Sequence, residues 1–196
     1  MATESFTELQ LDALRELANI GSGNAGTALG AMLGKSIEIS VPAAAALPLA
    51  DAVAMLGRPD EVRHGVLLPI VGDIDAVLLL LFAAEDARRL CGLYGIAPST
   101  PDGRSMLGEV GNILGSSYIN VLAQMAILDL EPAPPQVVHD LLGAIVQSVL
   151  LASADGADTA LILDSSLTVE NESCSLSFLL LASNDGVHRI LENVGL

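Results

Sequence analysis

The chain has 196 residues, of which 52% are hydrophobic and 16% charged, so it can bury a sizeable core, and this composition argues against disorder. Its formal net charge of −16 argues against partners such as nucleic acid or an anionic membrane surface, because phosphate groups are bound by lysine and arginine. The start MATESFTELQ lacks the basic residues and apolar run of a signal peptide, and no apolar run approaches the roughly 20 residues of a membrane span, so we expect a cytoplasmic globular protein.

The first half of the chain predicts a long helix followed by shorter elements. A helix is expected over residues 7–33, because Thr7 is a typical N-cap and Gly34 a typical helix stop. The hydrophobic pattern then predicts a strand, a short helix, two strands joined at Gly72-Asp73, and a closing helix. These elements are expected over residues 35–41, 51–56, 62–71, 76–82 and 85–94.

The second half predicts the same order of elements. Thr100 as N-cap and Pro101 at the first helical position begin a helix that extends to about residue 124. A strand, a helix, two strands joined around Asn171-Glu172 and a last helix follow, over residues 126–130, 139–151, 159–169, 174–181 and 184–192. Residues 97–103, rich in Pro, Ser and Gly, are the expected joint between the halves.

This repetition predicts the fold class and the domain organisation. We expect an α/β (α+β) protein in which the order helix, strand, helix, strand, strand, helix occurs twice with pseudo-two-fold symmetry. The antiparallel strand pairs should form a central sheet, and the two long helices should carry the functional residues. The chain, residues 1–196, is predicted to be a single domain made of two repeats, over about residues 7–95 and 100–194.

A four-residue motif occurs once in each half. The first copy, D-x3-E-x2-N-x22-P, consists of Asp12, Glu16, Asn19 and Pro42. The second copy, S-x3-E-x2-N-x22-P, consists of Ser105, Glu109, Asn112 and Pro135, each 93 positions after its counterpart. Four matches at one offset are hard to obtain by chance, and polar residues on a merely solvated helix face would be free to differ between the halves.

Helical geometry places the polar members of each motif on one face. Positions i, i+4 and i+7 of a helix lie within about 60° of one another. The opposite side of the first helix is small or apolar, with Leu11, Leu14, Leu17, Ala18 and Gly21. The second helix repeats this with Leu107, Val110, Gly111 and Leu114. Each helix is therefore expected to bury this small or apolar face and to present Glu and Asn to solvent on the opposite face.

Glu and Asn one turn apart are suited to positioning rather than to nucleophilic attack. A carboxamide can donate one hydrogen bond to a water molecule and accept another, and a carboxylate can bind a lysine. This suits phosphoryl-transfer chemistry in which a partner supplies the phosphate and the metal. The three histidines, His64, His139 and His188, are scattered without metal-ligand spacing. Cys91 and Cys174 are expected to be buried apolar residues.

Two other patterns are better explained by helix packing. Ser22, Ser116 and Ser117 lack the G-x-S-x-G context of a nucleophilic serine. Residues 21–26 fit G-x-G-x-x-G, but they lie inside a helical pattern, whereas a dinucleotide-binding loop follows a strand. Small residues that let the helix approach its neighbour explain both patterns.

The doubled motif resembles [D/S]-x3-E-x2-N-x22-P, the motif of the CheC/CheX/FliY phosphatases of chemotaxis, over essentially the whole chain. The resemblance implies a phosphatase that hydrolyses the aspartyl phosphate of a CheY-like response-regulator receiver. It implies one site at Glu16 and Asn19 and another at Glu109 and Asn112, in which Asn orients the attacking water and Glu pairs with a receiver lysine. It also implies that Mg²⁺ is bound by the receiver and that this chain binds no cofactor or metal.

The resemblance also bears on the remaining motif positions and on the subgroup. Asp12 and Ser105 would be supporting positions, and Pro42 and Pro135 would shape the strand beside each helix. Two intact motifs are typical of CheC rather than of CheX, and we expect no C-terminal flagellar-switch domain of the FliY kind. Some CheC proteins also bind CheD, and the sequence leaves that partnership open.

A non-catalytic protein is the alternative hypothesis. A CheC-like adaptor, or a flagellar-switch or CheD-binding module, could use the same fold. Such an adaptor would be expected to lose Glu or Asn in at least one repeat, and this chain keeps both in each. The sequence does not identify the cognate regulator, the more active site or the oligomeric state.

Overall fold

The computed structural model describes residues 7–152, 159–170 and 172–193. The helices are α1 (Glu8–Leu33), α2 (Leu49–Leu56), α3 (Ala84–Gly92), α4 (Pro101–Ala126), α5 (Leu142–Ala152) and α6 (Asn184–Asn193). The strands are β1 (Ile37–Pro48), β2 (Val62–Gly72), β3 (Ala76–Ala83), β4 (Leu130–Pro132), β5 (Gln136–Leu141), β6 (Thr159–Val169) and β7 (Glu172–Ala182).

The described strands form one antiparallel sheet with a palindromic order. The order is β1-β6-β7-β3-β2, and β4 and β5 both pair with the outer side of β2. β3 and β7 pair at the centre, where Leu79 lies opposite Leu179. Each hairpin therefore contributes its second strand to the middle, and the order from either edge is the same once each strand is replaced by its counterpart. This confirms the predicted fold class; the division into one domain of two repeats stays a prediction with which this order agrees.

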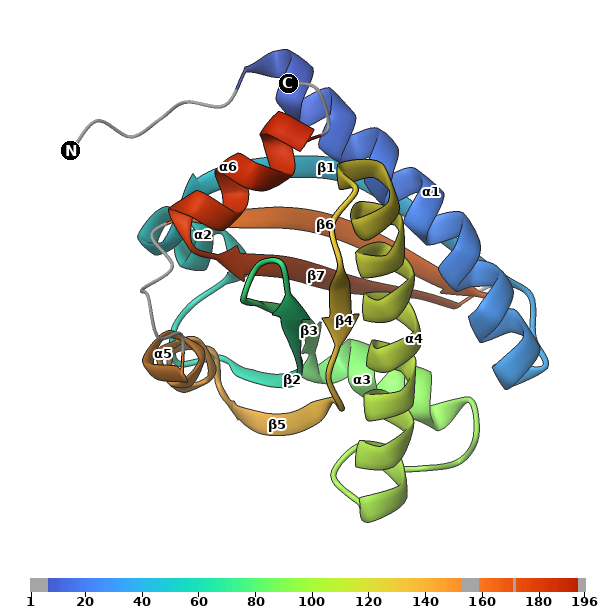
Figure 1. Cartoon of the computed structure of the whole chain (residues 1–196). Coiled ribbons are helices and arrows are strands. Elements are labelled where there is room, and N and C mark those ends of the chain that lie inside the picture. Colours follow the sequence, from blue (N-terminus) through green and yellow to red (C-terminus); the bar gives the residue numbers. More distant parts are fainter. Residues whose placement is uncertain (1–6, 153–158, 171, 194–196) are drawn as a thin grey trace.

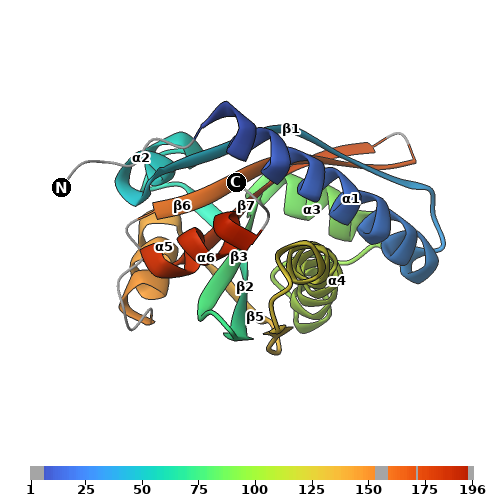
Figure 2. The ribbon, with the colours of Figure 1, turned by 45° about the horizontal axis from the view of Figure 1, so that its top comes forward.

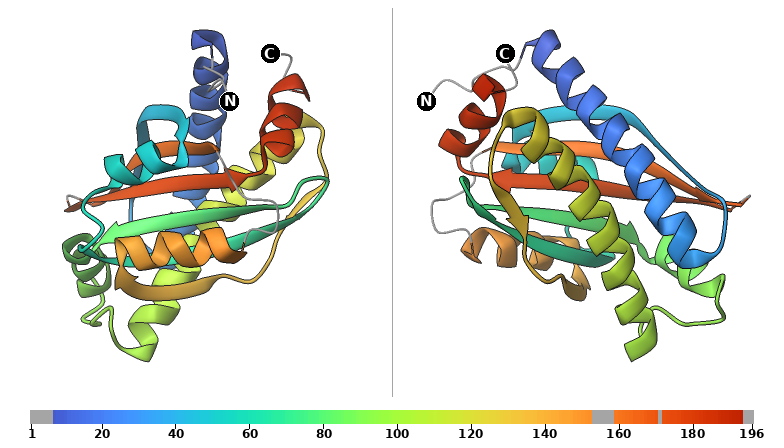
Figure 3. Two further views of the ribbon diagram at one scale, coloured as in Figure 1. Left: turned by 90° about the vertical axis from the view of Figure 1, so that its left-hand side faces the viewer. Right: turned by 45° about the vertical axis from the view of Figure 1, so that its right-hand side comes forward.

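Helices cover both faces of the sheet (Figure 1). α1 and α4 lie side by side across one face, as the right-hand view of Figure 3 shows, and α3 and α6 pack into the same large hydrophobic core. α2 and α5 lie on the opposite face above a smaller core that includes Leu79, Leu142 and Leu179 (Figure 2). The two long helices thus share one layer, and their outer surfaces face away from the sheet.

The caps of the long helices are the predicted ones. Thr7 accepts a hydrogen bond from the backbone N–H of Gln10, whose side chain accepts one from the N–H of Thr7, so a capping box begins α1. Gly34, with φ of 63°, ends α1 in the left-handed conformation. Thr100 caps α4 by accepting from Gly103 N–H at 3.1 Å, and Pro101 occupies its first turn.

Glycines bring α4 unusually close to the sheet. A Cβ atom on Gly111 would lie 2.6 Å from Cγ1 of Val66 on β2, nearer than carbon atoms can approach. A Cβ on Gly115 would lie 3.0 Å from the side chains of Leu68 and Leu78. The backbone of α4 therefore rests on the sheet, and this contact gives the residues on its outer face a rigid support.

Two predicted elements in the second half begin later than expected, and a strand that was not predicted lies between them. Of the strand predicted over residues 126–130, only Leu130 is in a strand, the first residue of β4, because α4 continues to Ala126 and Ile127 adopts the left-handed conformation as its C-cap. The helix predicted from residue 139 begins at Leu142, and Gln136–Leu141 forms β5 on the edge of the sheet. β4 and β5 together occupy the place that β1 occupies in the first half; residues 133–135, which include two prolines, separate them.

The other predictions for elements differ only at their boundaries. β1 extends to Pro48, well beyond the predicted residue 41. The remaining helices and strands begin and end at the expected positions or within three residues of them. Of the predicted turn at Asn171-Glu172, residue 171 lies outside the described residues and Glu172 begins β7.

Candidate functional site

The first motif presents an open polar surface on α1. Leu17 and Ala18 are buried in the core, whereas Glu16 and Asn19 are exposed. Neither Glu16 nor Asn19 has a hydrogen-bond or ion-pair partner among the described residues. Asp12 is also exposed and forms an ion pair at 2.9 Å with Arg15, one turn further along. The carboxylate of Glu16 and the carboxamide of Asn19 are therefore free to bind an external partner.

The second motif lies on α4 and is less open. Glu109 and Ser105 are exposed, and the carboxylate of Glu109 has no partner within the described part of the chain. Asn112 is half-buried, and its Oδ1 lies 3.5 Å from Oγ of Ser116. Behind this face the predicted apolar residues are all buried, namely Leu107, Val110, Gly111 and Leu114. Both asparagines thus retain an open side, but their surroundings differ.

The two motif helices are joined by a buried hydrogen bond. The hydroxyl of Tyr118 on α4 lies 2.6 Å from Oγ of Ser22 on α1, and Ser22 donates to the carbonyl of Ala18 at 2.8 Å. A Cβ on Gly21 would lie 3.0 Å from the Tyr118 ring, so the helices approach closely here. Burial raises the pKa of Tyr118. Ser22 and Gly21 are packing residues of α1, as predicted, and the G-x-G-x-x-G pattern lies in the interior of that helix.

The two motif prolines lie at interruptions of the sheet. Pro42 falls where the register between β1 and β6 shifts, between Ser40 and Ala43. Pro135 is half-buried and lies between β4 and β5. Proline has no N–H to donate to a strand ladder, so each proline accompanies a bulge or a break beside a motif helix. Their architectural role stays a prediction that these positions support.

The cysteines do not offer a nucleophile. Cys91 and Cys174 are both buried and unpaired, as predicted. Burial raises the pKa of Cys91, and burial together with the Asp86 carboxylate raises the pKa of Cys174 to about 11. Because the thiolate is the reactive form, both thiols are expected to be inert at neutral pH.

Two of the histidines that are far apart in the sequence meet in the structure. His64 on β2 lies opposite His139 on β5, and their rings stack with centroids 4.2 Å apart. His64 is buried, and its pKa is lowered to about 4 by desolvation and by the nearby His139 and Arg88. These histidines are scattered in the sequence, and only the pairing of β2 with β5 brings this pair together.

No group of three or more His, Cys, Asp or Glu side chains in the described ranges is arranged to hold a metal ion. Within the same ranges, no helix combines the length and the apolar character that a membrane span requires.

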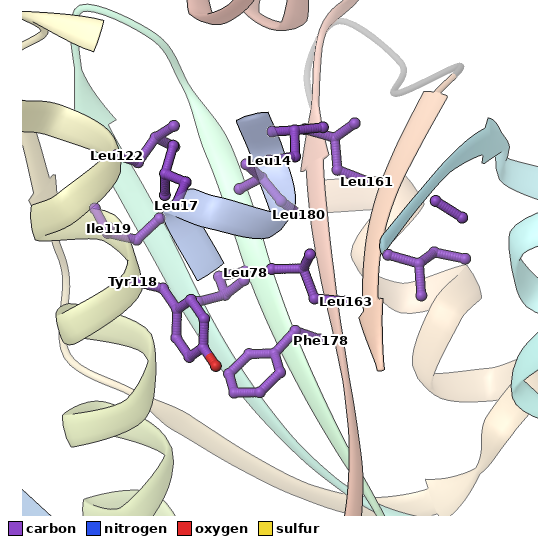
Figure 4. Close-up of a pocket in the computed structure, with 12 residues that line it drawn as sticks. Leu14, Leu17, Leu78, Tyr118, Ile119, Leu122, Leu161, Leu163, Phe178 and Leu180 are labelled. Atoms are coloured by element: carbon purple, nitrogen blue, oxygen red, sulfur yellow. The ribbon is translucent and has the colours of Figure 1, made fainter. Parts of the chain in front are cut away.

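An apolar cavity lies beneath the motif helices (Figure 4). Its volume is about 50 Å³, and its walls come from α1, α4 and the strands β1, β3, β6 and β7. Leu14 and Leu17 of α1 face Leu161, Leu163 and Leu180 of the sheet across it. Because its walls are almost entirely apolar and none of the motif polar residues lines it, the cavity is a gap in the packing under α1 rather than a reaction site.

Comparison with known proteins identifies the family. The sequence model of the CheC-like family matches residues 9–45 and 103–139, the two stretches that contain the motif. The CheY-P phosphatase CheC of Bacillus subtilis (strain 168) is 32% identical over 168 residues, which are 82% of this chain and 80% of that protein. The chain belongs to the CheC-like family. A second relative within this family, the putative CheY-P phosphatase CheC1 of Halobacterium salinarum, is 27% identical over 66% of this chain and 69% of its own.

Solved structures share the fold of this CheC-like chain. FliY of Thermotoga maritima superposes with a TM-score of 0.78 at 18% identity, over 98% of both chains. The FliM middle domain of H. pylori gives a TM-score of 0.69 at 10% identity, over 96% of this chain and 99% of that one. CheX of Desulfovibrio desulfuricans gives 0.51 at 15% identity, over 84% and 99%. At these identities the likeness shows the fold alone.

Proposed function

We propose that this chain is a phosphatase that hydrolyses the aspartyl phosphate of a CheY-like response-regulator receiver in chemotaxis signalling. The observation that carries the proposal is the Glu–Asn pair, with the Glu exposed and the Asn open on one side, that occurs intact on both long helices, inside the two stretches matched by the CheC-like family. The relative from Bacillus subtilis, which is called a CheY-P phosphatase, supports this choice of substrate.

In the proposed reaction, each asparagine orients a water molecule. The carboxamide of Asn19 or Asn112 donates through Nδ2 and accepts through Oδ1, so that the water oxygen points at phosphorus in line with the scissile P–O bond. The bond from water oxygen to phosphorus forms as the bond from phosphorus to the receiver's aspartyl oxygen breaks. Inorganic phosphate leaves as H2PO4⁻, which contains the water oxygen and both of its protons, and the receiver aspartate is regenerated as a carboxylate. Mg²⁺ bound by the receiver supplies charge stabilisation at the phosphoryl oxygens.

The glutamates are proposed to dock the receiver. Glu16 and Glu109 are exposed on rigid helices, and neither has a partner within the described part of the chain. A carboxylate in this state can form a charge-assisted hydrogen bond with a receiver lysine. Because the chain carries a net charge of −16, long-range attraction to another acidic protein cannot supply the docking energy, so local pairs must supply it.

Phosphate release from a phosphorylated receiver with Mg²⁺ tests the proposal. The wild-type chain should accelerate release, and the Asn19→Ala/Asn112→Ala variant should nearly abolish the acceleration, since both substitutions are at helix surfaces and leave the fold intact. Each single Asn variant should retain part of the activity. The Glu16→Gln/Glu109→Gln variant should chiefly raise the apparent KM, whereas the Asn variants should chiefly lower kcat. A folded double Asn variant with full activity would refute the mechanism.

A non-catalytic adaptor is the second candidate. The fold is shared with FliM of H. pylori, which has been solved in complex with FliG, and it fits a module that binds partners without chemistry. An adaptor would bind the phosphorylated receiver and leave the rate of phosphate release unchanged, so the same assay separates the two functions. Binding of CheD is a further open partnership, which a pull-down with purified CheD would test.

A further inference from the structure

The two proposed sites differ in the residue one turn after each asparagine. On α4 this residue is Ser116, whose hydroxyl donates to Oδ1 of Asn112 with the two oxygens 3.5 Å apart. The corresponding position after Asn19 on α1 is Gly23, which has no side chain. The hydrogen bond to the asparagine side chain therefore exists in only one of the two motifs.

This use of a helix hydroxyl is unusual within the molecule. Serine and threonine in helix interiors commonly donate to the backbone carbonyl four residues earlier. Among the described residues, four do so at 2.7–3.0 Å: Ser22, Thr27, Ser117 and Ser148. Ser116 instead donates to the side chain of the residue four positions earlier. Adjacent serines on α4 thus have different roles, Ser117 bonding the backbone of Ile113 and Ser116 the carboxamide of Asn112.

The contact with Ser116 would fix which way the carboxamide faces. Rotation about the last side-chain torsion of asparagine exchanges Oδ1 and Nδ2, and this torsion is broad when nothing restrains it. A hydroxyl that donates to Oδ1 holds the oxygen toward Ser116 and directs Nδ2 away from it. Oδ1 keeps a second lone pair, so Asn112 can still accept from a water molecule. The half-burial of Asn112, compared with the exposure of Asn19, limits its motion further.

We propose that Ser116 is a positioning residue that pre-orients the Asn112 carboxamide, and that the α4 site is for this reason the faster of the two sites. The inference rests on the proposed phosphatase function. An oriented carboxamide loses less freedom when it binds the attacking water, so the effect belongs to kcat rather than to receiver affinity.

The first test removes the Ser116 hydroxyl while only the α4 site is active. In an Asn19→Ala background, Ser116→Ala should lower kcat about fivefold with unchanged KM, which at about 1.4 kcal/mol per tenfold corresponds to about 1 kcal/mol. Ser117→Ala is the matched control, because it removes the adjacent hydroxyl that bonds the backbone, and its kcat should stay unchanged. Ser116→Thr keeps a hydroxyl and should restore most of the rate. Thermal unfolding of each variant reports any loss of fold.

The second test moves the hydroxyl to the other site. In an Asn112→Ala background, where only the α1 site is active, Gly23→Ser should raise kcat about fivefold, again about 1 kcal/mol. The substitution has room, because a Cβ on Gly23 would have no heavy atom within 4 Å. Gly23→Ala is the matched control; it stiffens the helix without adding a hydroxyl and should give no gain.

An NMR measurement separates failure of this inference from failure of the proposed function. The side-chain amide of Asn112 should show a higher order parameter than that of Asn19, and Ser116→Ala should lower it toward the value of Asn19. If the chain is no phosphatase, the order parameters still decide whether Ser116 orients Asn112. If the double Asn variant is inactive but Ser116→Ala and Ser117→Ala have equal kcat values, the phosphatase function stands and the role of Ser116 is refuted. Equal order parameters for Asn112 and Asn19 would also overturn it.

Discussion

Replacing Gly111 by alanine would push α4 away from the sheet at the residue next to Asn112. The new Cβ would lie 2.6, 2.8 and 3.0 Å from Cγ1, Cβ and Cγ2 of Val66. Val66 is fully buried on β2, and its branched side chain has little rotational freedom, so it cannot turn aside. Carbon atoms pack at about 3.5–4.0 Å, so the helix must move by about 1 Å. The first repeat has Ala18 at the equivalent position, so the close approach is particular to α4.

The expected loss of stability is moderate. Inserting a methylene-sized group into a packed core costs about 1–3 kcal/mol, and alanine returns about 0.5–1 kcal/mol through its better helix propensity. Gly111→Ala should therefore lower the free energy of unfolding by about 1–2 kcal/mol, as measured by urea denaturation. Gly23→Ala, where the space is open, should instead stabilise the protein by up to about 1 kcal/mol. In the Asn19→Ala background, Gly111→Ala should also lower kcat about tenfold or more, because a shift of about 1 Å misplaces Asn112.

A double-mutant cycle tests the contact between Gly111 on α4 and Val66 on β2. Val66→Ala alone should lower stability by about 2 kcal/mol through the cavity it leaves. In the double variant the Gly111→Ala methyl occupies part of that cavity, so the combined loss should be smaller than the sum of the single losses by about 1 kcal/mol or more. Strict additivity, or an unchanged free energy of unfolding for Gly111→Ala, would show that α4 does not rest on β2 as described.

The remaining predictions concern three buried groups, His64, Tyr118 and Cys174. The pKa of His64 is about 4 in the folded protein and about 6.5 in the unfolded chain. The free energy of unfolding should therefore fall as the pH drops from 6.5 to 4, by at most about 3 kcal/mol. In urea titrations at several pH values, His64→Gln should reduce this dependence. His139→Ala should raise the pKa of His64, measurable by NMR, since it removes a neighbouring positive charge; an unchanged pKa would contradict this. Tyr118→Phe should lower the free energy of unfolding by about 1 kcal/mol, because it removes the hydrogen bond to Ser22, and an unchanged value would show that the bond contributes nothing. Cys174, with a pKa of about 11, should react with a thiol reagent at pH 7 only after unfolding, and rapid labelling of the native protein would contradict its burial.

Local sequence signals predicted the features that depend on a few neighbouring residues. Thr7, Gly34 and Thr100 begin and end the long helices where expected, because a cap satisfies backbone groups within one turn. The exposed faces of Glu16 and Glu109 follow from helical period alone. The strand predicted over residues 126–130, which begins only at Leu130, shows the limit of such signals. Ile127 and Leu128 favour a strand locally, but a long helix resting on the sheet extends to Ala126 and needs Ile127 as its cap.

By itself the sequence determined the internal repeat, the fold class and the four polar residues that form the candidate sites, since each is recorded as residue types at fixed spacings. The difference between Ser116 and Gly23 is also present in the sequence, whereas tertiary structure alone decided how deeply each site is buried and what lies beneath it. Three features depend on segments distant in sequence: the partial burial of Asn112, the close packing of Gly111 against Val66, and the stacking of His64 on His139. Such contacts arise from the pairing of strands and the packing of helices on them, and periodicity along one segment carries no information about its partner across the core.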